Sequence, residues 1–310
     1  MSTSDGYDTV TIRSEGGVAQ AQFVPAANML CCSLSLDGEE LLDAGRGVGA
    51  YAQRGKTMGI PLLHPWANRL AARGYAAAGK KVTLPDPEGR YPLDPNGLPI
   101  HGALPRLLSW RLDDGLPGDR IRGRLDWTTD ELLQLFPFEH ELIVEARVRD
   151  DGLELVTTLR ATGDDAVPVS FGYHPYLTLA GTRREDWQVS LGAARRLVLD
   201  DQMLPTGTSE PIRERQFTLA DKSFDDGLVG LDAPPEFKVA ADRSALTVTF
   251  EEGYGYGQVY APPGHDFICF EPMTALTNAL VSGDGLTIVS PGHEHRAAFK
   301  ITVTENSEET

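Results

Sequence analysis

The sequence has few cysteines and no long apolar run. Its 310 residues include 3 cysteines, with Cys31 and Cys32 adjacent and Cys269 far away, and this odd number cannot build a disulfide framework. Sparse cysteines are typical of reduced thiols, so we expect a cytoplasmic protein. The first residues lack a basic stretch followed by an apolar one, and no apolar run approaches the roughly 18 residues of a membrane-spanning helix. The sequence therefore predicts neither secretion nor membrane insertion.

Basic residues are also in short supply. Lys and Arg total 28 against 45 Asp and Glu, which leaves a net charge of −17. Such a field repels nucleic-acid phosphates and anionic lipid headgroups, so we expect no nucleic acid and no membrane as partner. It also disfavours anionic small molecules, unless basic residues gather locally.

Several catalytic motifs are missing. No Gly-x-Gly-x-x-Gly opens a helix, no Gly-x-Ser-x-Gly elbow is present, and the cysteines have no activating neighbour in sequence. His293 and His295 lie two residues apart without a third placed ligand, which favours a solvated hairpin over a metal site. We expect no metal and no cofactor.

Strand patterns, by contrast, run through most of the chain, and the best helix candidate, residues 129–135, is short. Clusters of Asp, Ser and Gly between the strands predict turns, and the Gly-Tyr-Gly-Tyr-Gly run at 253–257 predicts a turn with stacking side chains. No linker-like block divides the chain, so we expect a single domain over 1–310. The prediction is an all-β protein built as a large antiparallel sandwich. The strand candidates are residues 10–13, 141–148, 153–160, 245–250, 286–289 and 300–304.

Two segments combine a titratable side chain with proline. Residues 171–177 read Phe-Gly-Tyr-His-Pro-Tyr-Leu, and residues 270–274 read Phe-Glu-Pro-Met-Thr. Each proline fixes its own φ and biases the residue before it towards extended backbone, so His174 and Glu271 are expected on stiff backbone. A histidine that titrates near neutrality and a carboxylate form a general acid/base pair. Such a pair can open and close a sugar ring without a metal or cofactor.

Further motifs lie upstream. Residues 59–70 read Gly-Ile-Pro-Leu-Leu-His-Pro-Trp-Ala-Asn-Arg-Leu, and residues 100–102 read Ile-His-Gly. With these, the chain resembles the aldose 1-epimerase (galactose mutarotase) family, whose members share an Asn-Arg, a His-Gly, a Tyr-His-Pro-Tyr and a Phe-Glu-Pro in that order. Phe224-Asp225-Asp226 is a weaker fifth match. The resemblance covers roughly residues 10–303, followed by a polar, acidic C-terminal tail, and it implies a galactose mutarotase-like supersandwich.

The resemblance also implies roles for individual residues. His174 would be the acid that protonates the ring oxygen, and Glu271 the base that deprotonates the anomeric hydroxyl. Arg69 and His101 would bind the ring-oxygen side, and Asp225 would accept from sugar hydroxyls. Asn68 and Tyr176 would complete the sugar site. Independently of the resemblance, Trp66, Tyr173 and Tyr176 flank these polar groups and could serve as aromatic platforms, although core packing explains each of them equally well. Two choices stay open: His64 competes with His101, and Asp226 with Asp225.

The predicted function is a mutarotase that interconverts the α and β anomers of a free hexose, acting as a monomer or homodimer. One alternative is a hexose 6-phosphate as substrate, which would need cations such as Arg73, Arg106, Arg183 and Arg184 around the distal end of the sugar. Another is a sugar-binding or sensing protein without turnover. The net charge favours the free hexose, with turnover that depends weakly on salt.

Overall fold

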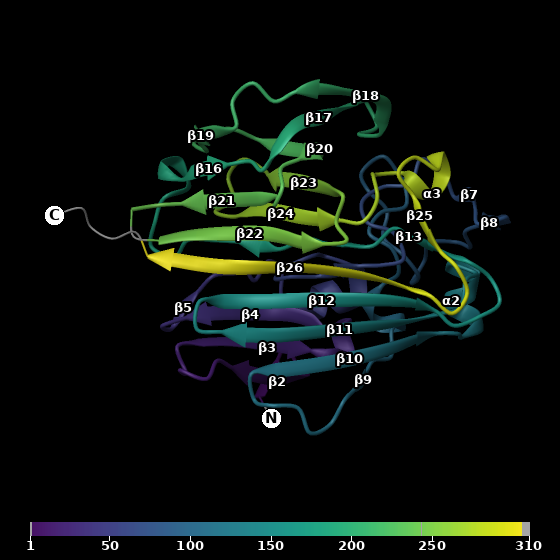
Figure 1. The fold of residues 1–310 in the computed structure, drawn as a ribbon, viewed down its shortest axis with the longest axis horizontal. Helices are drawn as coiled ribbons and strands as arrows, with labels where there is room; N and C mark the ends of the chain where they lie inside the picture. Colours follow the sequence, from purple (N-terminus) through teal and green to yellow (C-terminus); the bar gives the residue numbers. More distant parts are fainter. Residues whose placement is uncertain (1, 243, 306–310) are drawn as a thin grey trace.

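The computed structural model describes residues 2–242 and 244–305, and antiparallel strands dominate its regular structure (Figure 1). Strands β11 (His140–Arg149) and β12 (Gly152–Ala161) illustrate why. Their side chains alternate between buried and exposed or half-buried positions, which is the period of a strand with one face on the core. The predicted strands at 141–148 and 153–160 are thus confirmed, with the expected tight turn at Asp150-Asp151 between them.

The largest sheet has nine strands in the order β19-β16-β21-β22-β26-β12-β11-β10-β9. Besides β11 and β12, its strands are β9 Arg111–Leu112, β10 Arg120–Trp127, β16 Gln188–Ser190, β19 Gln216–Thr218, β21 Glu236–Ala240, β22 Ser244–Glu252 and β26 Glu294–Glu305. Strands β22 and β26 confirm the predictions for residues 245–250 and 300–304.

An eight-stranded sheet follows the order β18-β17-β20-β23-β24-β14-β6, with β15 also paired to β24. Its strands are β6 Leu62–Leu63, β14 Gly172–Tyr173, β15 Tyr176–Leu177, β17 Ala193–Leu199, β18 Pro205–Pro211, β20 Phe224–Leu231, β23 Tyr256–Ala261 and β24 Ile268–Met273.

A five-stranded sheet, in the order β1-β2-β3-β4-β5, and two hairpin-sized sheets, β13 with β25 and β7 with β8, complete the strands. Their bounds are β1 Ser2–Ser4, β2 Tyr7–Arg13, β3 Ala19–Val24, β4 Leu30–Leu36, β5 Glu39–Glu40, β7 Gly74–Ala77, β8 Lys80–Thr83, β13 Val167–Val169 and β25 Thr287–Val289. Strands β2 and β25 confirm the predictions for residues 10–13 and 286–289, the latter from Thr287 onwards.

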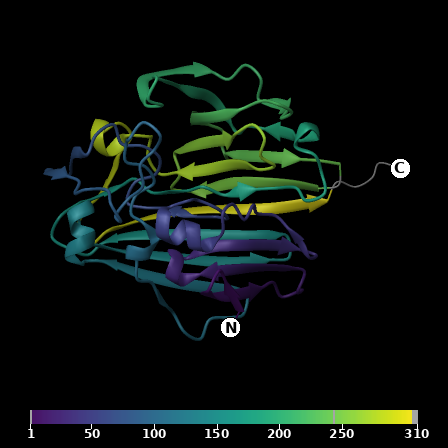
Figure 2. The same ribbon diagram turned by 180° about the vertical axis from the view of Figure 1, so that it is seen from behind.

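The five-stranded and the eight-stranded sheet cover different halves of the nine-stranded sheet (Figures 1 and 2). The five-stranded sheet packs through β2 and β3 against β11. The eight-stranded sheet packs on the other half, where Phe237 of β21 stacks on Phe270 of β24 with ring centroids 5.8 Å apart. This arrangement confirms the predicted supersandwich of large antiparallel sheets.

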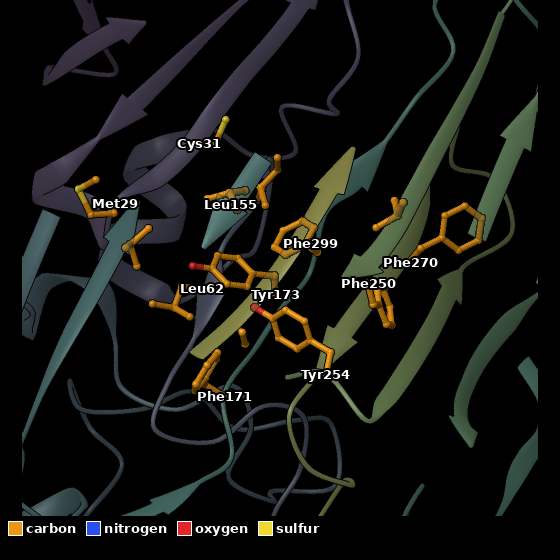
Figure 3. Close-up of a cluster of buried hydrophobic side chains, with 14 of the residues drawn as sticks. Met29, Cys31, Leu62, Leu155, Phe171, Tyr173, Phe250, Tyr254, Phe270 and Phe299 are labelled. Carbon is orange, nitrogen blue, oxygen red and sulfur yellow. The ribbon is translucent and has the colours of Figure 1, made fainter. Parts of the chain in front are cut away.

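Aromatic side chains fill the junction between the layers (Figure 3). Tyr254 is the clearest example, because its ring contacts Phe171, Phe250 and Phe299. The stacking predicted for the 253–257 run is therefore replaced by edge-to-face packing, because the Tyr254 ring meets all three neighbours at steep angles. The predicted turn there ends early, since β23 already begins at Tyr256.

The helices are short: α1 Val48–Arg54, α2 Asp130–Leu135 and α3 Ala279–Ser282, with 3-10 turns at Pro25–Ala27, Pro105–Leu107 and Arg184–Asp186. Helix α2 confirms the prediction for 129–135, and Thr129 caps it by accepting a hydrogen bond from the Leu132 amide. Helix α1 was not predicted. In the described part of the chain, none of the helices is long and apolar enough to cross a membrane.

The three cysteines are free thiols, as expected, and two of them are buried. Burial raises the pKa of the half-buried Cys32 to about 11. Within residues 2–242 and 244–305, no cluster of three or more His, Cys, Asp or Glu side chains could hold a metal. His293 and His295 each lie within hydrogen-bond distance of a backbone carbonyl. Most of the acidic tail expected after residue 303 lies outside the described residues.

Candidate active site

Strands β20, β23 and β24 place several polar side chains on one face of the eight-stranded sheet. Glu271 on β24 lies opposite Gln258 on β23, and Asp225 on β20 lies opposite Tyr260 on β23. Residues opposite one another in an antiparallel pair share a face, and so do residues two apart on a strand. Asp225, Gln258, Tyr260 and Glu271 therefore point to the same side. Asp226 points to the other.

This face is the floor of a cleft with a volume of about 620 Å³. Loops from elsewhere in the chain form its walls, including the segment around helix α1 and the loop that contains Asp94. The titratable and aromatic residues that line it are Asp43, Arg46, Arg54, Lys56, Arg69, Asp94, His101, His174, Tyr176, Asp225, Tyr260, His265, Phe267 and Glu271.

His174 and Glu271 meet at the floor of the cleft. The Nε2 atom of His174 lies 3.3 Å from the Oε1 atom of Glu271, and both side chains are almost completely buried. Burial lowers the pKa of His174 to about 3. Burial, with a smaller contribution from Asp225, raises the pKa of Glu271 well above its usual value, while Arg69 opposes the rise. The opposite pKa shifts of His174 and Glu271 describe a pair that holds one proton between its two side chains.

Neighbouring aromatic rings hold His174 in place. The Tyr176 ring stacks on it at 4.5 Å between centroids, and the His101 ring meets it edge-on at 5.7 Å. The Nδ1 atoms of His101 and His174 are buried and have no hydrogen-bond partner among the described residues. Burial, followed by the positive charges of neighbouring groups, lowers the pKa of His101 well below its usual value. His101 is therefore a neutral donor or acceptor beside the pair.

Arg69 is fixed by hydrogen bonds on several sides. Its Nε donates to Asp94 at 3.0 Å, its Nη1 donates to the Asn68 side-chain oxygen at 3.1 Å, and its Nη2 donates to Asp225 at 3.4 Å. Asp225 also accepts a bond of 2.6 Å from the Gln258 amide. This network fixes the planar guanidinium at the cleft, where its donors suit an oxygen that becomes electron-rich.

The structure separates the two candidate histidines. His64 is buried away from the cleft, with its Nε2 atom 2.9 Å from that of His140 and its ring packed edge-on to Trp127. His101 lines the cleft, and its backbone adopts a positive φ of 62°. Gly102 follows with a φ of 73°, and a Cβ there would lie 2.1 Å from the His64 carbonyl oxygen. Glycine is required at this close approach, which positions His101.

The two candidate aspartates also lie apart. Asp226 faces a second cavity, of about 470 Å³, where its carboxylate lies 3.5 Å from Arg196. Asp225 is the one in the cleft. Among the aromatic candidates only Tyr176 lines the cleft. Trp66 and Tyr173 are buried in the core, so their suggested role as sugar platforms is wrong, because core packing takes both rings.

None of the four arginines considered for a phosphate group lines the cleft. Arg73 binds Asp86 and Arg183 binds Asp186. Arg106 donates to the Gly89 carbonyl, and Arg184 donates to the backbone carbonyls of residues 220, 222 and 261. This suggestion is therefore corrected: the cations of the cleft are instead Arg46, Arg54, Lys56 and Arg69.

Sequence reasoning missed several residues of the site. Asp94, Gln258 and Tyr260 belong to no motif that we recognised, and their neighbours carry no chemical pattern. Thr57 was also missed, although its hydroxyl lies 2.6 Å from the Tyr176 hydroxyl and so positions the ring that stacks on His174. Side chains alternate between the two faces of β20 and β23, so Gln258 and Tyr260 could have been found once the pairing of these strands was known.

A nine-stranded sheet covered by two others, with a polar cleft on the eight-stranded one, defines the galactose mutarotase-like class of β-sandwich proteins. The chain belongs to the aldose 1-epimerase family, whose sequence model matches residues 32–302.

Two relatives show the level of sequence identity between this chain and other proteins. The uncharacterized protein YihR of Escherichia coli K12 is 27% identical over 268 residues, which cover 78% of this chain and 80% of YihR. Human galactose mutarotase is 35% identical over 165 residues, which cover 49% of this chain and 42% of the human protein. This match thus spans less than half of either protein.

Solved structures share the fold across the whole chain. Slr1438 from Synechocystis sp. PCC 6803 has a TM-score of 0.78 at 23% identity and covers 99% of both chains. Galactose 1-epimerase from Lactobacillus acidophilus NCFM has a TM-score of 0.76 at 15% identity, with 99% of this chain and 97% of the other covered. At such identities the likeness concerns the fold alone.

Proposed function

We propose that this protein is an aldose 1-epimerase, which interconverts the α and β anomers of a free hexose. The observation that carries the proposal is the contact of 3.3 Å between His174 and Glu271 at the floor of a polar cleft. The anomeric hydroxyl and the ring oxygen of an aldose are bonded to the same carbon. An acid and a base that serve these two oxygens must therefore be neighbours.

The proposed reaction moves protons only. Glu271, as the carboxylate, takes the proton of the anomeric hydroxyl while His174 gives a proton to the ring oxygen. The bond between the anomeric carbon and the ring oxygen breaks, and the anomeric carbon becomes an aldehyde. After half a turn about the bond to the second carbon, the ring closes from the other face as both protons return. Because the pair holds one proton, its transfer from Glu271 to His174 produces the carboxylate and the protonated histidine that the reaction needs.

The remaining residues of the cleft would bind and orient the sugar. Arg69 and the neutral His101 are proposed to donate to the ring-oxygen side, and Asp225 to accept from ring hydroxyls. Asn68 holds Arg69 through its side-chain oxygen, and Tyr176 buttresses His174. Charged and amide groups fixed in advance by their own hydrogen bonds lose little freedom when the sugar binds.

Polarimetry tests the proposal. Freshly dissolved α-glucose and α-galactose are mixed with the purified protein, and the approach of the optical rotation to its equilibrium value is followed. We expect a rate that rises in proportion to protein concentration. If the rate equals that of buffer alone while calorimetry detects sugar binding, the protein is a binding module, and the proposed reaction is rejected.

A further inference from the structure

Three cations stand together on one rim of the cleft. Arg46 lies in the loop before helix α1, Arg54 ends the helix, and Lys56 follows it. All three are exposed, and within the described residues their side chains form no ion pair and no hydrogen bond. Arg69, on the floor of the same cleft, is paired with two carboxylates. The rim cations are thus available to a ligand.

Local structure accounts for only part of this cluster. A cation in the last turn of a helix interacts favourably with the carbonyl end of the helix, which suits Arg54. Lys56 follows the C-cap of the helix and shares this interaction, whereas Arg46 precedes the helix and gains nothing from it. The carboxylate of Asp43, which also lines the cleft, accepts a hydrogen bond of 2.8 Å from the Gly45 amide. In a chain of net charge −17, three unpaired cations at one cleft form a local excess of positive charge of the kind that an anionic ligand needs.

The rim is connected to the catalytic pair by two contacts. Lys56 precedes Thr57, whose hydroxyl lies 2.6 Å from the hydroxyl of Tyr176. The Tyr176 ring in turn stacks on His174. Lys56 therefore adjoins the His174 side of the cleft. The other two rim cations lie near the two ends of helix α1, which ends shortly before Lys56. In the proposed reaction, His174 serves the ring oxygen.

The ring oxygen of a hexopyranose is bonded to the fifth carbon, which bears the sixth. A group on the sixth carbon therefore projects from the ring-oxygen side of the sugar, towards the side on which the rim lies. We propose that Arg46, Arg54 and Lys56 bind an acidic group there, so that the preferred substrate is an aldose with a carboxylate or phosphate on its sixth carbon. This inference rests on the proposed anomerisation chemistry and changes its preferred substrate from a neutral free hexose to an acidic one.

Electrostatics at short range supports this substrate over a neutral one. The molecule as a whole repels anions, and on that ground the sequence predicts a neutral hexose. Beyond a Debye length of about 8 Å, however, physiological salt screens most of this repulsion. Cations in the cleft act at shorter distance, and an arginine fork can bind a carboxylate or phosphate through two hydrogen bonds. The rim cations thus act on a bound anion with less screening than the distant carboxylates do.

The test compares kcat/KM for glucose, glucuronate and glucose 6-phosphate by polarimetry at low and at physiological ionic strength. We expect at least one acidic sugar to exceed glucose by about tenfold, since three exposed ion pairs together are worth roughly one factor of ten. We also expect that advantage to fall as salt rises. The two acidic sugars distinguish a carboxylate from a phosphate as the recognised group.

A triple variant, Arg46→Ala, Arg54→Ala and Lys56→Ala, should lower the ratio of acidic to neutral turnover by about tenfold. The matched control replaces Arg13, Lys81 and Arg213 by alanine. These residues are exposed, do not line the cleft, and change the net charge equally. The control should leave the ratio as in the unmodified protein. An equal loss in both variants would show a long-range effect and overturn the rim as a site.

Failure of the proposed function can be told apart from failure of this inference. Methyl glycosides cannot open their rings, so calorimetry with methyl glucuronide and methyl glucoside measures binding without turnover. Tighter binding of the glucuronide that is lost in the rim variant supports the rim even if no sugar is anomerised. Equal binding of both glycosides, together with no preference for either acidic sugar in turnover, overturns the inference.

Discussion

At the scale of single residues, Glu271 is the group whose chemistry can be removed with the least change of shape. Glu271→Gln keeps the size of the side chain and removes its basicity. We expect the anomerisation rate to fall by at least about 10²-fold, because a positioned base contributes that much. The melting temperature should barely change.

Asp226→Asn is the matched control for Glu271→Gln, because it makes the same kind of change on the opposite face of the same sheet. It should keep the full rate. Near-normal turnover in Glu271→Gln would disprove its role as the base.

His174→Asn tests the acid. The variant should lose most of its turnover and still bind sugar weakly, because Arg69, His101 and Asp225 keep their mutual positions. Calorimetric titration beside a thermal melt measures both properties. Simultaneous loss of binding and of folding would instead indicate that His174 is a packing residue.

The pair should also set the pH dependence of kcat/KM, which reports on the free enzyme. Burial lowers the pKa of His174 to about 3, so a second proton joins the pair only in strong acid. Activity should therefore persist well below pH 6.5, the ordinary value for histidine, and be lost on the alkaline side when Glu271 gives up the shared proton. An acid limb centred near pH 6.5 would show that an ordinary histidine controls the rate.

At the scale of elements, the turn at Gly102 carries His101 into the cleft. Gly102→Ala would combine a positive φ with a Cβ that collides with the His64 carbonyl oxygen. We expect a loss of stability of about 1–3 kcal/mol or more and a raised KM. Thermal melts and sugar titrations measure the two effects.

Gly97→Ala is the control for the turn, since Gly97 has a φ of 79° and open space around its Cα. It should show the conformational cost alone. If both variants are equally stable, the close approach at Gly102 is not important.

The strands that could be predicted are those whose pattern is local. Alternation over 141–148 and 153–160 needs only the neighbouring residues, and β11 and β12 follow it. Helix α1 escaped prediction because it has no side-chain cap and no acidic residue in its first turn, whereas the similarly short α2 has Thr129 as its cap and two acidic residues. Asp225 could not be separated from Asp226, since adjacent residues on a strand exchange faces when its register shifts by one.

The same reasoning explains the site. Proline motifs pointed to His174 and Glu271, because the feature that stiffens each one is the next residue in the chain. Asp94, Lys56 and Thr57 reach the cleft through loops, whose course depends on how the sheets pack. Their sequence surroundings contain nothing that distinguishes them from surface residues.

At the scale of the whole molecule, buried histidines should limit stability in acid. Burial keeps the pKa values of His64, His101, His140 and His174 well below 6.5, so the unfolded state binds up to four more protons there than the folded state. At Glu271 the folded state instead binds one proton more than the unfolded state, because burial raises its pKa, and this offsets part of the effect. Stability should therefore decrease as the pH falls from 7 to 5, by on the order of several kcal/mol.

Thermal melts across that pH range measure the effect. A melting temperature that stays constant or rises towards pH 5 would show that these histidines are charged in the folded state.

The two faces of β20 also offer a way to attach a fluorescent label. Asp226 lies on the same strand as the cleft residue Asp225 but opens on the other side. A dye on Asp226→Cys would sit behind the sugar without entering its site. The natural thiols would compete poorly for it, because Cys31 and Cys269 are buried and Cys32, with its pKa of about 11, holds little thiolate at neutral pH. Sugar binding could then be followed optically in an otherwise unaltered chain.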